Sequence, residues 1–333
     1  MPRIPEGIIG CVESREFDEL DRRIVAALQV NGRASWRRIA DVLGEPFRTV
    51  TRRGLALLES GSVRIAGLAA LGPTHLIELD CEPGRLEDVA ERLAENPDVI
   101  FVYALSSPMR LIVEVHARPG QLAELVLDEL PRLEGVLQVD AAPVLEYFRT
   151  VADWHPGPIT ESEAELLRDA PPSPARPVAP SDADGIDSQI VRLLVADGRV
   201  PVADICTAVG LTPPAVRRRL TAMLERGALS VRAIVDPADI GFPVEAVLWA
   251  RVAPSEAREV GRLVAEAPGV RYAVMAVGEF QLMVNVTVAG LEELRSFLTE
   301  SPWTARVQAI RTSLVVRAFK RGGVTMHASA ATG

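Results

Sequence analysis

The sequence predicts an α+β protein built from two similar halves, each a three-helix unit with a β wing followed by a βαββαβ unit. Two observations predict this. A shift of 166 residues places the segment that begins at Leu20 over the segment that begins at Ile186 without a gap. Within each half, apolar residues first recur at helical spacing, and strand-like runs then alternate with helical stripes. The chain is therefore interpreted as a tandem duplication.

The three-helix unit is clearest in the second half. Its three apolar faces are Ile190, Leu193 and Leu194, then Ile205 and Val209, then Val216, Leu220, Met223 and Leu224. Asp187 is expected to cap the first helix, Gly198 to end it, Gly210 to make the turn before the third helix, and Gly227 to terminate that helix. The β-prone run 229–235 follows, so the order predicts a winged helix-turn-helix.

A different rhythm follows each wing. In the second half we expect strands at 246–252, 270–277, 282–288 and 307–319, with helical stripes at 260–267 and 291–298. In the first half we expect strands at 76–79, 99–105, 111–115 and 136–148, with helical stripes at 86–93 and 122–130. The order βαββαβ predicts a ferredoxin-like fold in both halves.

The expected domains follow from these elements. They are a winged helix-turn-helix at 17–68, a βαββαβ domain at 72–150, a linker at 151–185, a second winged helix-turn-helix at 186–236, a second βαββαβ domain at 241–320 and a flexible tail at 321–333. The linker is rich in proline, alanine, serine and acidic residues, a composition that does not form a core. Within it, Thr160 is expected to cap one short helix.

Composition narrows the function classes. No apolar run is long enough to span a membrane and the N-terminus lacks a secretory core, so we expect a cytoplasmic protein. The cysteines and histidines stand apart without the spacing of metal ligands: Cys11, Cys81 and Cys206; His75, His116, His155 and His327. We therefore expect reduced thiols, no metal, no cofactor and no catalytic residues.

Positive charge gathers in the three-helix units of a chain whose net charge is −9. The segment 199–232 holds six arginines against two acidic residues, and 33–64 holds seven against three. Lys320 is the only lysine. Guanidinium groups form paired hydrogen bonds with phosphate and guanine, so this distribution indicates DNA binding on an otherwise acidic protein. Arginines that merely solvate the polar face of a packed helix are the alternative.

The motifs resemble those of the Lrp/AsnC (feast/famine) transcription regulators. The resemblance rests on DGR at 197–199, GLTPPAVRRRLTAMLERGAL at 210–229, VDPADIGFPVEAVL at 235–248 and VGEFQLMVNVTV at 277–288. It implies a DNA-binding regulator whose βαββαβ part is a RAM domain modulated by a small molecule such as an amino acid. Single-repeat members are dimers that assemble further, so a duplicated chain departs from the family pattern.

The resemblance implies that the recognition helix lies within 211–226. The candidate DNA-binding residues are Arg33, Arg48, Thr49, Arg52, Arg53, Arg199, Pro213, Pro214, Arg217, Arg218 and Arg219. The first unit carries Glu45 in its turn and Gly54 inside its third helix, where glycine is costly, so a purely structural first unit is an alternative. Trp36 is expected to pack or to contact the DNA backbone.

The same resemblance implies an effector loop between the second and third strands of the second RAM domain. Its residues are Gly278, Glu279, Phe280 and Gln281, where Gln281 replaces the usual acid. A plain β-turn without a ligand is the alternative. The matching first-half residues are Ser107, Pro108, Met109 and Arg110, which indicate a lost effector loop or a different anion held by Arg110.

Two other functions stay open. Sirohaem decarboxylases resemble the same family and use histidine and arginine near a tetrapyrrole, and His75 and His116 lie on expected strands of the first RAM domain. A ligand-sensing scaffold without DNA binding is the second. For the regulator, we expect the two RAM sheets to pair within one chain as a pseudo-dimer, which then forms a further homo-oligomer on an operator.

Overall fold

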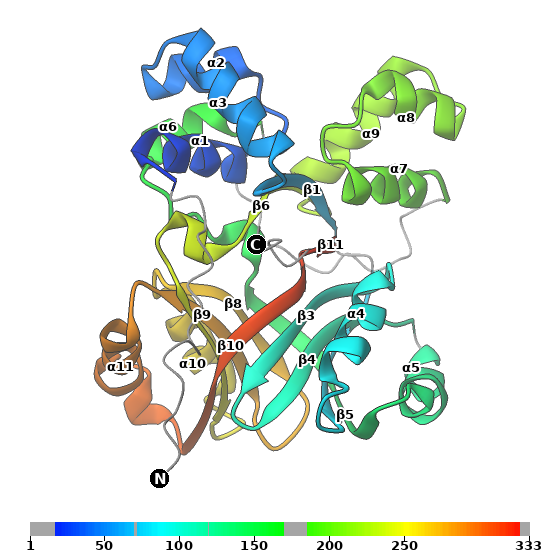
Figure 1. Ribbon diagram of the computed structural model, residues 1–333, viewed down its shortest axis with the longest axis vertical. Helices are drawn as coiled ribbons and strands as arrows, with labels where there is room; N and C mark the ends of the chain where they lie inside the picture. The colour runs from blue at the N-terminus through cyan, green and yellow to red at the C-terminus, as the bar shows by residue number, and fades with distance from the viewer. Residues whose placement is uncertain (1–16, 70–71, 119, 170–184, 327–333) are drawn as a thin grey trace, which may run out of the picture.

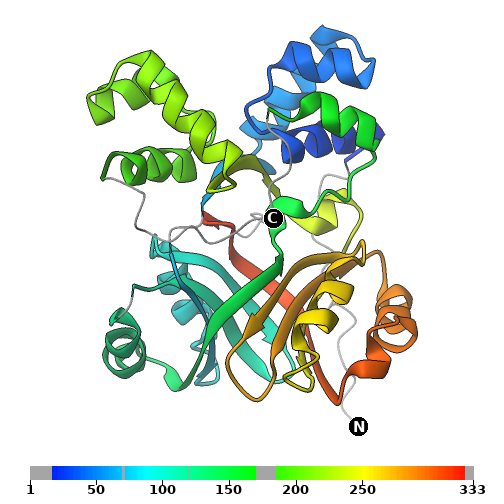
Figure 2. The same ribbon diagram turned by 180° about the vertical axis from the view of Figure 1, so that it is seen from behind.

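The two halves cross one another in space. The computed structural model describes residues 17–69, 72–118, 120–169 and 185–326. In Figures 1 and 2 the first three-helix unit stands above the second βαββαβ unit, and the second three-helix unit stands above the first. Each three-helix unit with its wing is called a headpiece below.

The headpieces contain the predicted helices. The first consists of α1 (Glu19–Val30), α2 (Trp36–Leu43), α3 (Phe47–Glu59) and strand β1 (Val63–Ala69), and the second of α7 (Gly185–Ala196), α8 (Val202–Val209), α9 (Pro213–Glu225) and strand β6 (Leu229–Val235). Gly44 and Gly210 end α2 and α8 in the left-handed conformation, with φ of 68° and 67°. Glycine adopts this conformation without a Cβ penalty, which explains both tight turns.

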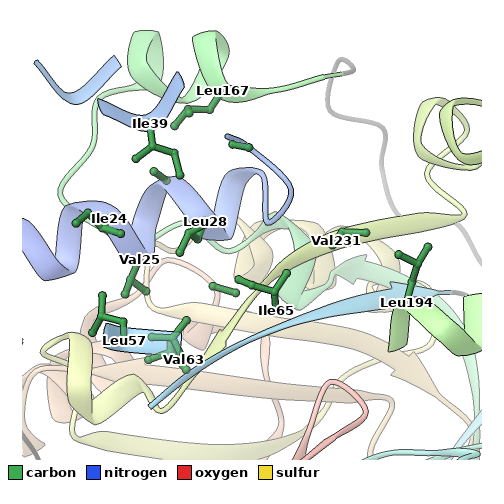
Figure 3. Close-up of a cluster of buried hydrophobic side chains, with 14 of the residues drawn as sticks. Ile24, Val25, Leu28, Ile39, Leu57, Val63, Ile65, Leu167, Leu194 and Val231 are labelled. Carbon is green, nitrogen blue, oxygen red and sulfur yellow. The ribbon is translucent and has the colours of Figure 1, made fainter. Parts of the chain in front are cut away.

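The wing strands pair with each other. β1 and β6 form an antiparallel ribbon in which Val63 lies opposite Val235 and Ala69 opposite Leu229. One hydrophobic core runs through both headpieces: it includes the fully buried Leu28 and Leu194, one from each headpiece, together with Ile65 and Val231 from the wing strands. Figure 3 shows these side chains around the ribbon. The headpieces therefore form one packed layer.

The βαββαβ units have the predicted order. The first contains β2 (Thr74–Cys81), α4 (Leu86–Glu95), β3 (Val99–Ser106), β4 (Met109–His116), α5 (Gln121–Glu124), π-helical η1 (Leu125–Glu129), η2 (Leu130–Arg132) and β5 (Val136–Arg149). The second contains η5 (Pro237–Ile240), β7 (Val244–Arg251), α10 (Ala257–Ala265), β8 (Val270–Ala276), β9 (Leu282–Val288), α11 (Leu291–Glu300), η6 (Thr304–Arg306), β10 (Ala309–Arg321) and β11 (Val324–Thr325). The stripe predicted at 122–130 is thus a short α-turn continued by a π-turn.

The long last strand of each unit joins the two sheets. β5 pairs with β2 along its first part and with β8 along its second, while β10 pairs first with β7 and then with β3. The order is β11-β10-β3-β4-β2-β5-β8-β9-β7, and the β10–β7 pairing closes it into a barrel. Closure removes the exposed edges that an open sheet would present.

Strand alternation separates two kinds of core. Strand side chains such as Ile77 and Val284 pack against the helices outside the barrel, whereas Leu76, Phe101 and Trp249 face the barrel interior. The interior is shared by both halves, so neither sheet buries its inner face alone.

The segment after β5 corrects the expected linker. η3 (Val151–Asp153) and α6 (Glu161–Leu167) follow β5, and Thr160 caps α6 as predicted. Trp154 and Leu167 are buried in the headpiece core, so 151–169 does contribute to a core, contrary to the composition argument. Isolated apolar anchors of this kind barely change the average composition of a segment, so composition does not predict them. The expected linker residues 170–184 lie outside the described residues.

Two further expectations need correction. Asp187 lies inside the first turn of α7 instead of capping it, and its carboxylate accepts from Arg219 at 2.8 Å. The expected tail at 321–333 begins inside β10, where Arg321 is buried, and continues into β11. Residues 327–333, with His327, lie outside the described residues, as does Cys11.

None of the described helices combines the length and apolar character that crossing a bilayer requires. Cys81 and Cys206 are free thiols.

Candidate nucleic-acid interface

Helix α9 presents one apolar and one basic face. Val216, Leu220 and Met223 recur at helical spacing and are buried in the headpiece core. The opposite face is exposed and carries Arg217 and Arg218. Neither arginine has an ion-pair partner within the described part of the chain. Pro213 and Pro214 occupy the exposed first turn of this helix, where proline costs no hydrogen bond.

Helix α3 presents the corresponding face in the first headpiece. Val50 and Leu57 are buried, whereas Arg48 and Arg52 are exposed and Thr49 is half-buried. Phe47 is 41% exposed at the start of the helix, with the Arg37 guanidinium 4.6 Å from its ring centroid. The first headpiece therefore retains a basic outer face despite the different turn sequence.

Two of the candidate arginines brace the headpieces internally. Arg219 of α9 pairs with Asp187 of α7 at 2.8 Å. Arg53 holds the same position in the first headpiece, where it pairs with Asp21 at 3.0 Å and also with Asp18. Asp21 and Asp187 are buried, so each needs a cation. These arginines fasten the third helix to the first.

Arg33 and Arg199 join the two headpieces to each other. Arg33 donates to the carbonyls of Gly198 and Val200 at 2.6 and 3.0 Å. Arg199 reciprocates by donating to the carbonyls of Gly32 and Ala34 at 2.8 and 3.0 Å. The contact is a pseudo-twofold joint made by the repeated Gly-Arg dipeptide. Its partners lie more than 160 residues away in the chain, which is why the repeat by itself gave no sign of this role.

The glycines of that dipeptide allow the joint to close. Gly32 donates its N–H to the carbonyl of Val231, and Gly198 donates to that of Ile65, both at 2.8 Å. A Cβ on Gly32 would lie 2.9 Å from the backbone of Arg232, and one on Gly198 would lie 2.9 Å from the backbone of Ala66. The turn at Gly32 therefore packs against β6 of the second half, and the turn at Gly198 packs against β1 of the first half.

Gly54 and Trp36 form a matched pair inside the first headpiece. A Cβ on Gly54 would lie 2.3 Å from the Trp36 ring. The guanidinium of Arg199 lies 4.5 Å from the ring centroid on Trp36. Gly54 therefore leaves space for the ring of Trp36. Trp36 packs inside the headpiece, which is one of the two roles that the sequence predicts for it.

The candidate effector loop is exposed at the end of β8. Gly278 has φ of 142°, a conformation that other residues rarely adopt. Glu279 pairs with Arg251 at 3.0 Å, and Phe280 lies against Arg311, 5.6 Å from its guanidinium. Gln281 donates its amide to the carbonyls of Gly278 and Glu279 and accepts from the N–H of Val252. Gln281 therefore holds the turn together.

The matching loop of the first half is occupied differently. Arg110 pairs with Asp80 at 3.0 Å and with Glu78 at 3.4 Å, and Arg311 from the other half also binds Glu78. The anions beside Arg110 are therefore carboxylates of its own sheet. Ser107 accepts a hydrogen bond from Ser313, which ties this loop to β10.

His75 and His116 do not converge. Thr74 lies opposite His116 and His75 opposite Val115, so the two imidazoles project from opposite faces of the sheet. Burial lowers the pKa of both. The buried carboxylate of Glu114 is not among the residues predicted from the sequence. The alternation of apolar and polar residues along β4 does not show that this strand faces a second sheet.

Comparison with known proteins agrees with this architecture. Residues 17–57 and 184–224 match the AsnC-type helix-turn-helix domain, and residues 74–150 and 245–325 match the Lrp/AsnC ligand binding domain. An uncharacterised HTH-type transcriptional regulator of Pyrococcus furiosus is 33% identical over 133 residues, which are 38% of this chain and 90% of that protein. The HTH-type transcriptional regulator Ptr1 of Methanocaldococcus jannaschii is 28% identical over 141 residues, 42% of this chain and 95% of that protein.

A solved structure is similar over most of the chain. The siroheme decarboxylase NirDL aligns with 91% of this chain and 93% of its own, with a TM-score of 0.54 and 18% identity. At that identity the likeness concerns the fold, and it shows that the duplicated arrangement occurs elsewhere. The matched domains cover both halves in tandem, and on these grounds the chain belongs to the Lrp/AsnC family of transcription regulators.

Proposed function

We propose that the exposed faces of α3 and α9 together read double-stranded DNA as a sequence-specific operator. The observation that supports this most is the sorting of the arginines. Arg53 and Arg219 are neutralised by buried carboxylates, whereas Arg52 and Arg218, one residue earlier, are exposed on the outer face. Free guanidinium forks on a helix face suit phosphates and guanine edges.

The proposed DNA surface consists of Arg48, Thr49, Arg52, Pro213, Pro214, Arg217 and Arg218. Arg33, Arg53, Arg199 and Arg219 are left out because their guanidiniums hold the headpieces together. The turns and third helices of the two headpieces differ in sequence, so each reads a different half-site and the operator is an imperfect palindrome.

The test is the double variant Arg217→Ala/Arg218→Ala, measured by fluorescence anisotropy on a duplex selected from a random pool. Loss of two forks weakens binding by about 1–3 kcal/mol for each fork that pairs with guanine. The double variant Arg92→Ala/Arg262→Ala, which removes equal charge from α4 and α10, keeps full affinity. Equal affinities for the two variants at physiological salt would refute the assignment.

The loop at 278–281 is the proposed site for an amino acid or related effector. The exposed pair of Glu279 and Arg251 offers one carboxylate and one guanidinium, which match the ammonium and carboxylate of a zwitterion. Gly278→Val is expected to abolish the effector's influence on DNA affinity and to leave binding without effector intact. A variant that still responds fully would place this site elsewhere.

We further propose that the chain is a regulator and not a tetrapyrrole decarboxylase. The cavity beside His116 has a volume of about 160 Å³, and none of the described residues that line it is arginine or lysine. The cavity is smaller than a tetrapyrrole. It also contains the carboxyl group of Glu114, which does not suit a decarboxylase substrate because that substrate is itself an anion. Absence of spectral change on adding sirohaem, beside retained DNA binding, is the expected result.

We also propose that the chain is located in the cytoplasm and that the pseudo-dimer assembles further.

A further inference from the structure

A cavity of about 160 Å³ lies between the wing ribbon and the open end of the barrel. Its walls come from both halves: Gly67, Leu68 and Ser230 from the ribbon, and Glu114, Tyr147 and Tyr272 from the barrel. Tyr272 lies near the start of β8, whereas the loop at 278–281 follows the end of that strand. The cavity is therefore distinct from the proposed effector loop.

The one carboxylate among the described lining residues is Glu114, which is only 2% exposed. Its Oε1 atom accepts from the hydroxyls of Tyr147 and Tyr272, both at 2.7 Å. These donors are neutral, and the described residues place no arginine or lysine in an ion pair with Glu114. Burial raises the pKa of this carboxyl, and the hydroxyl donors oppose that shift.

The second half also buries a carboxylate, but there the chain supplies a cationic side chain that pairs with it. Superposing the halves by a shift of 171 residues, which places residue 74 over 245 as the matched domains do, sets Asn285 at the place of Glu114 and Glu245 at that of Thr74. The same shift sets Arg321 at the place of Thr150. Glu245 binds Arg321 at 2.9 and 2.6 Å, with Arg271 at 3.3 Å.

The first half lacks the cationic side chain that the second half places beside its buried carboxylate. In the second half a buried carboxylate is neutralised by a guanidinium that the chain supplies from the end of its last strand. In the first half the corresponding residue, Thr150, is short and lines the cavity. The space beside Glu114 is thus open where the related space is filled by a cationic side chain.

The walls of the cavity suit a cation with an apolar body. Tyr272 packs edge-on against Tyr147 and Phe101, with ring centroids 5.9 and 6.0 Å apart. Aromatic faces attract ammonium groups, most strongly where water is excluded. Valine and isoleucine side chains from β3 complete the wall.

We propose that this cavity binds a compact apolar monoamine whose ammonium pairs with Glu114. A cavity of about 150 Å³ holds a benzene ring, which bounds the apolar part to roughly that size. The described lining residues include no arginine or lysine. The one imidazole among them, that of His116, has a pKa lowered by burial, so the lining favours a simple amine over an amino-acid zwitterion. This site goes beyond the proposed DNA function and does not depend on it.

The test uses the full-length chain without DNA and titrates benzylamine calorimetrically, with benzyl alcohol and benzoate as neutral and anionic probes of similar shape. Benzylamine is expected to bind, and benzoate is not. Glu114→Gln keeps the hydroxyl contacts but removes the charge, and it should weaken benzylamine about 10- to 100-fold, the scale of a charge-assisted hydrogen bond. Glu82→Gln, an exposed carboxylate outside the cavity, serves as the matched control and keeps full affinity.

A second variant protects the test against misfolding of the first. Leu68→Trp fills the cavity from the ribbon and leaves Glu114 untouched, so it too should abolish benzylamine binding. Absence of benzylamine binding to the unaltered chain would overturn the proposal. Undiminished binding to Glu114→Gln, or benzoate binding as tightly as benzylamine, would also overturn it. Because no DNA is present, these outcomes are independent of whether α3 and α9 read an operator.

Discussion

At the scale of single residues, arginines that look alike in the sequence have three different tasks. Arg199 joins the headpieces, Arg219 neutralises a buried aspartate, and Arg218 is exposed on the outer face of α9. The sequence predicts where arginines gather, because composition is local. It does not predict which guanidinium is already engaged, because Gly32 and Ala34, the partners of Arg199, belong to the other half.

Arg199→Ala is expected to lower the free energy of unfolding by about 1–3 kcal/mol, since two carbonyls lose a charged donor. Arg199→Lys should restore little of this, because one ammonium does not reproduce the planar fork that reaches both carbonyls. Urea denaturation measures the effect. Full stability combined with lost DNA affinity would instead assign Arg199 to the DNA surface.

His155 gives the molecule a predictable response to acid. Burial, assisted by the positive charges of Arg232, Arg168 and Arg149, lowers its pKa to about 3. Below the ordinary pKa of about 6.5 the unfolded chain binds a proton that the folded chain does not. Stability therefore falls as the pH drops from about 6.5 toward 3.

Urea titrations near pH 7 and near pH 5 test this with His155→Gln. The variant should lose less stability between the two values than the unaltered chain does. Equal losses would show that His155 does not contribute to the pH dependence.

At the scale of elements, local patterns predict well and pairing between distant segments does not. The strand predicted at 282–288 coincides with β9, and the wing predicted at 229–235 coincides with β6. Alternation and glycine breaks determine such elements within a few residues. The pairing of β1 with β6 depends on a register between two halves, which no local pattern contains. The apolar anchors Trp154 and Leu167 were not predicted because two isolated apolar residues barely change the composition of a polar segment.

Helix α3 illustrates how tertiary packing overrides propensity. Alanine favours a helix interior over glycine by about 1 kcal/mol. At Gly54, however, the added Cβ would meet the Trp36 ring, and overpacking costs about 1–3 kcal/mol. Gly54→Ala is therefore expected to destabilise the chain.

A double-mutant cycle with Trp36→Leu checks this explanation by urea denaturation. The smaller side chain frees the space, so Gly54→Ala should become neutral or stabilising in that background. The same cost in both backgrounds would mean that Trp36 is not the obstacle.

At the scale of the whole molecule, the repeat predicts that the two sheets pair within one chain, and the structure shows which strands join the two halves. Among the described residues, three strand pairings connect the halves: β1 with β6, β3 with β10, and β5 with β8. The tandem repeat and the two βαββαβ units were predictable because each is encoded locally. Barrel closure, the crossed headpieces and the Glu114 cavity were not, because each arises only where the two halves meet.

The dependence of one half on the other can be tested by cutting the chain between them. A protease site inserted near Pro174 lies outside the described residues and breaks none of the three pairings. After cleavage, the fragments are expected to stay together at the mass of the uncut chain and to keep operator affinity, because a shared headpiece core and a closed barrel hold them. Analytical ultracentrifugation of cut and uncut protein measures the mass, and anisotropy measures the affinity. The cleaved protein should separate only when denaturant unfolds the barrel. Fragments that part freely while DNA is still bound tightly would show that each half folds and acts alone, and the joint made by Arg33 and Arg199 would then have no part in DNA recognition.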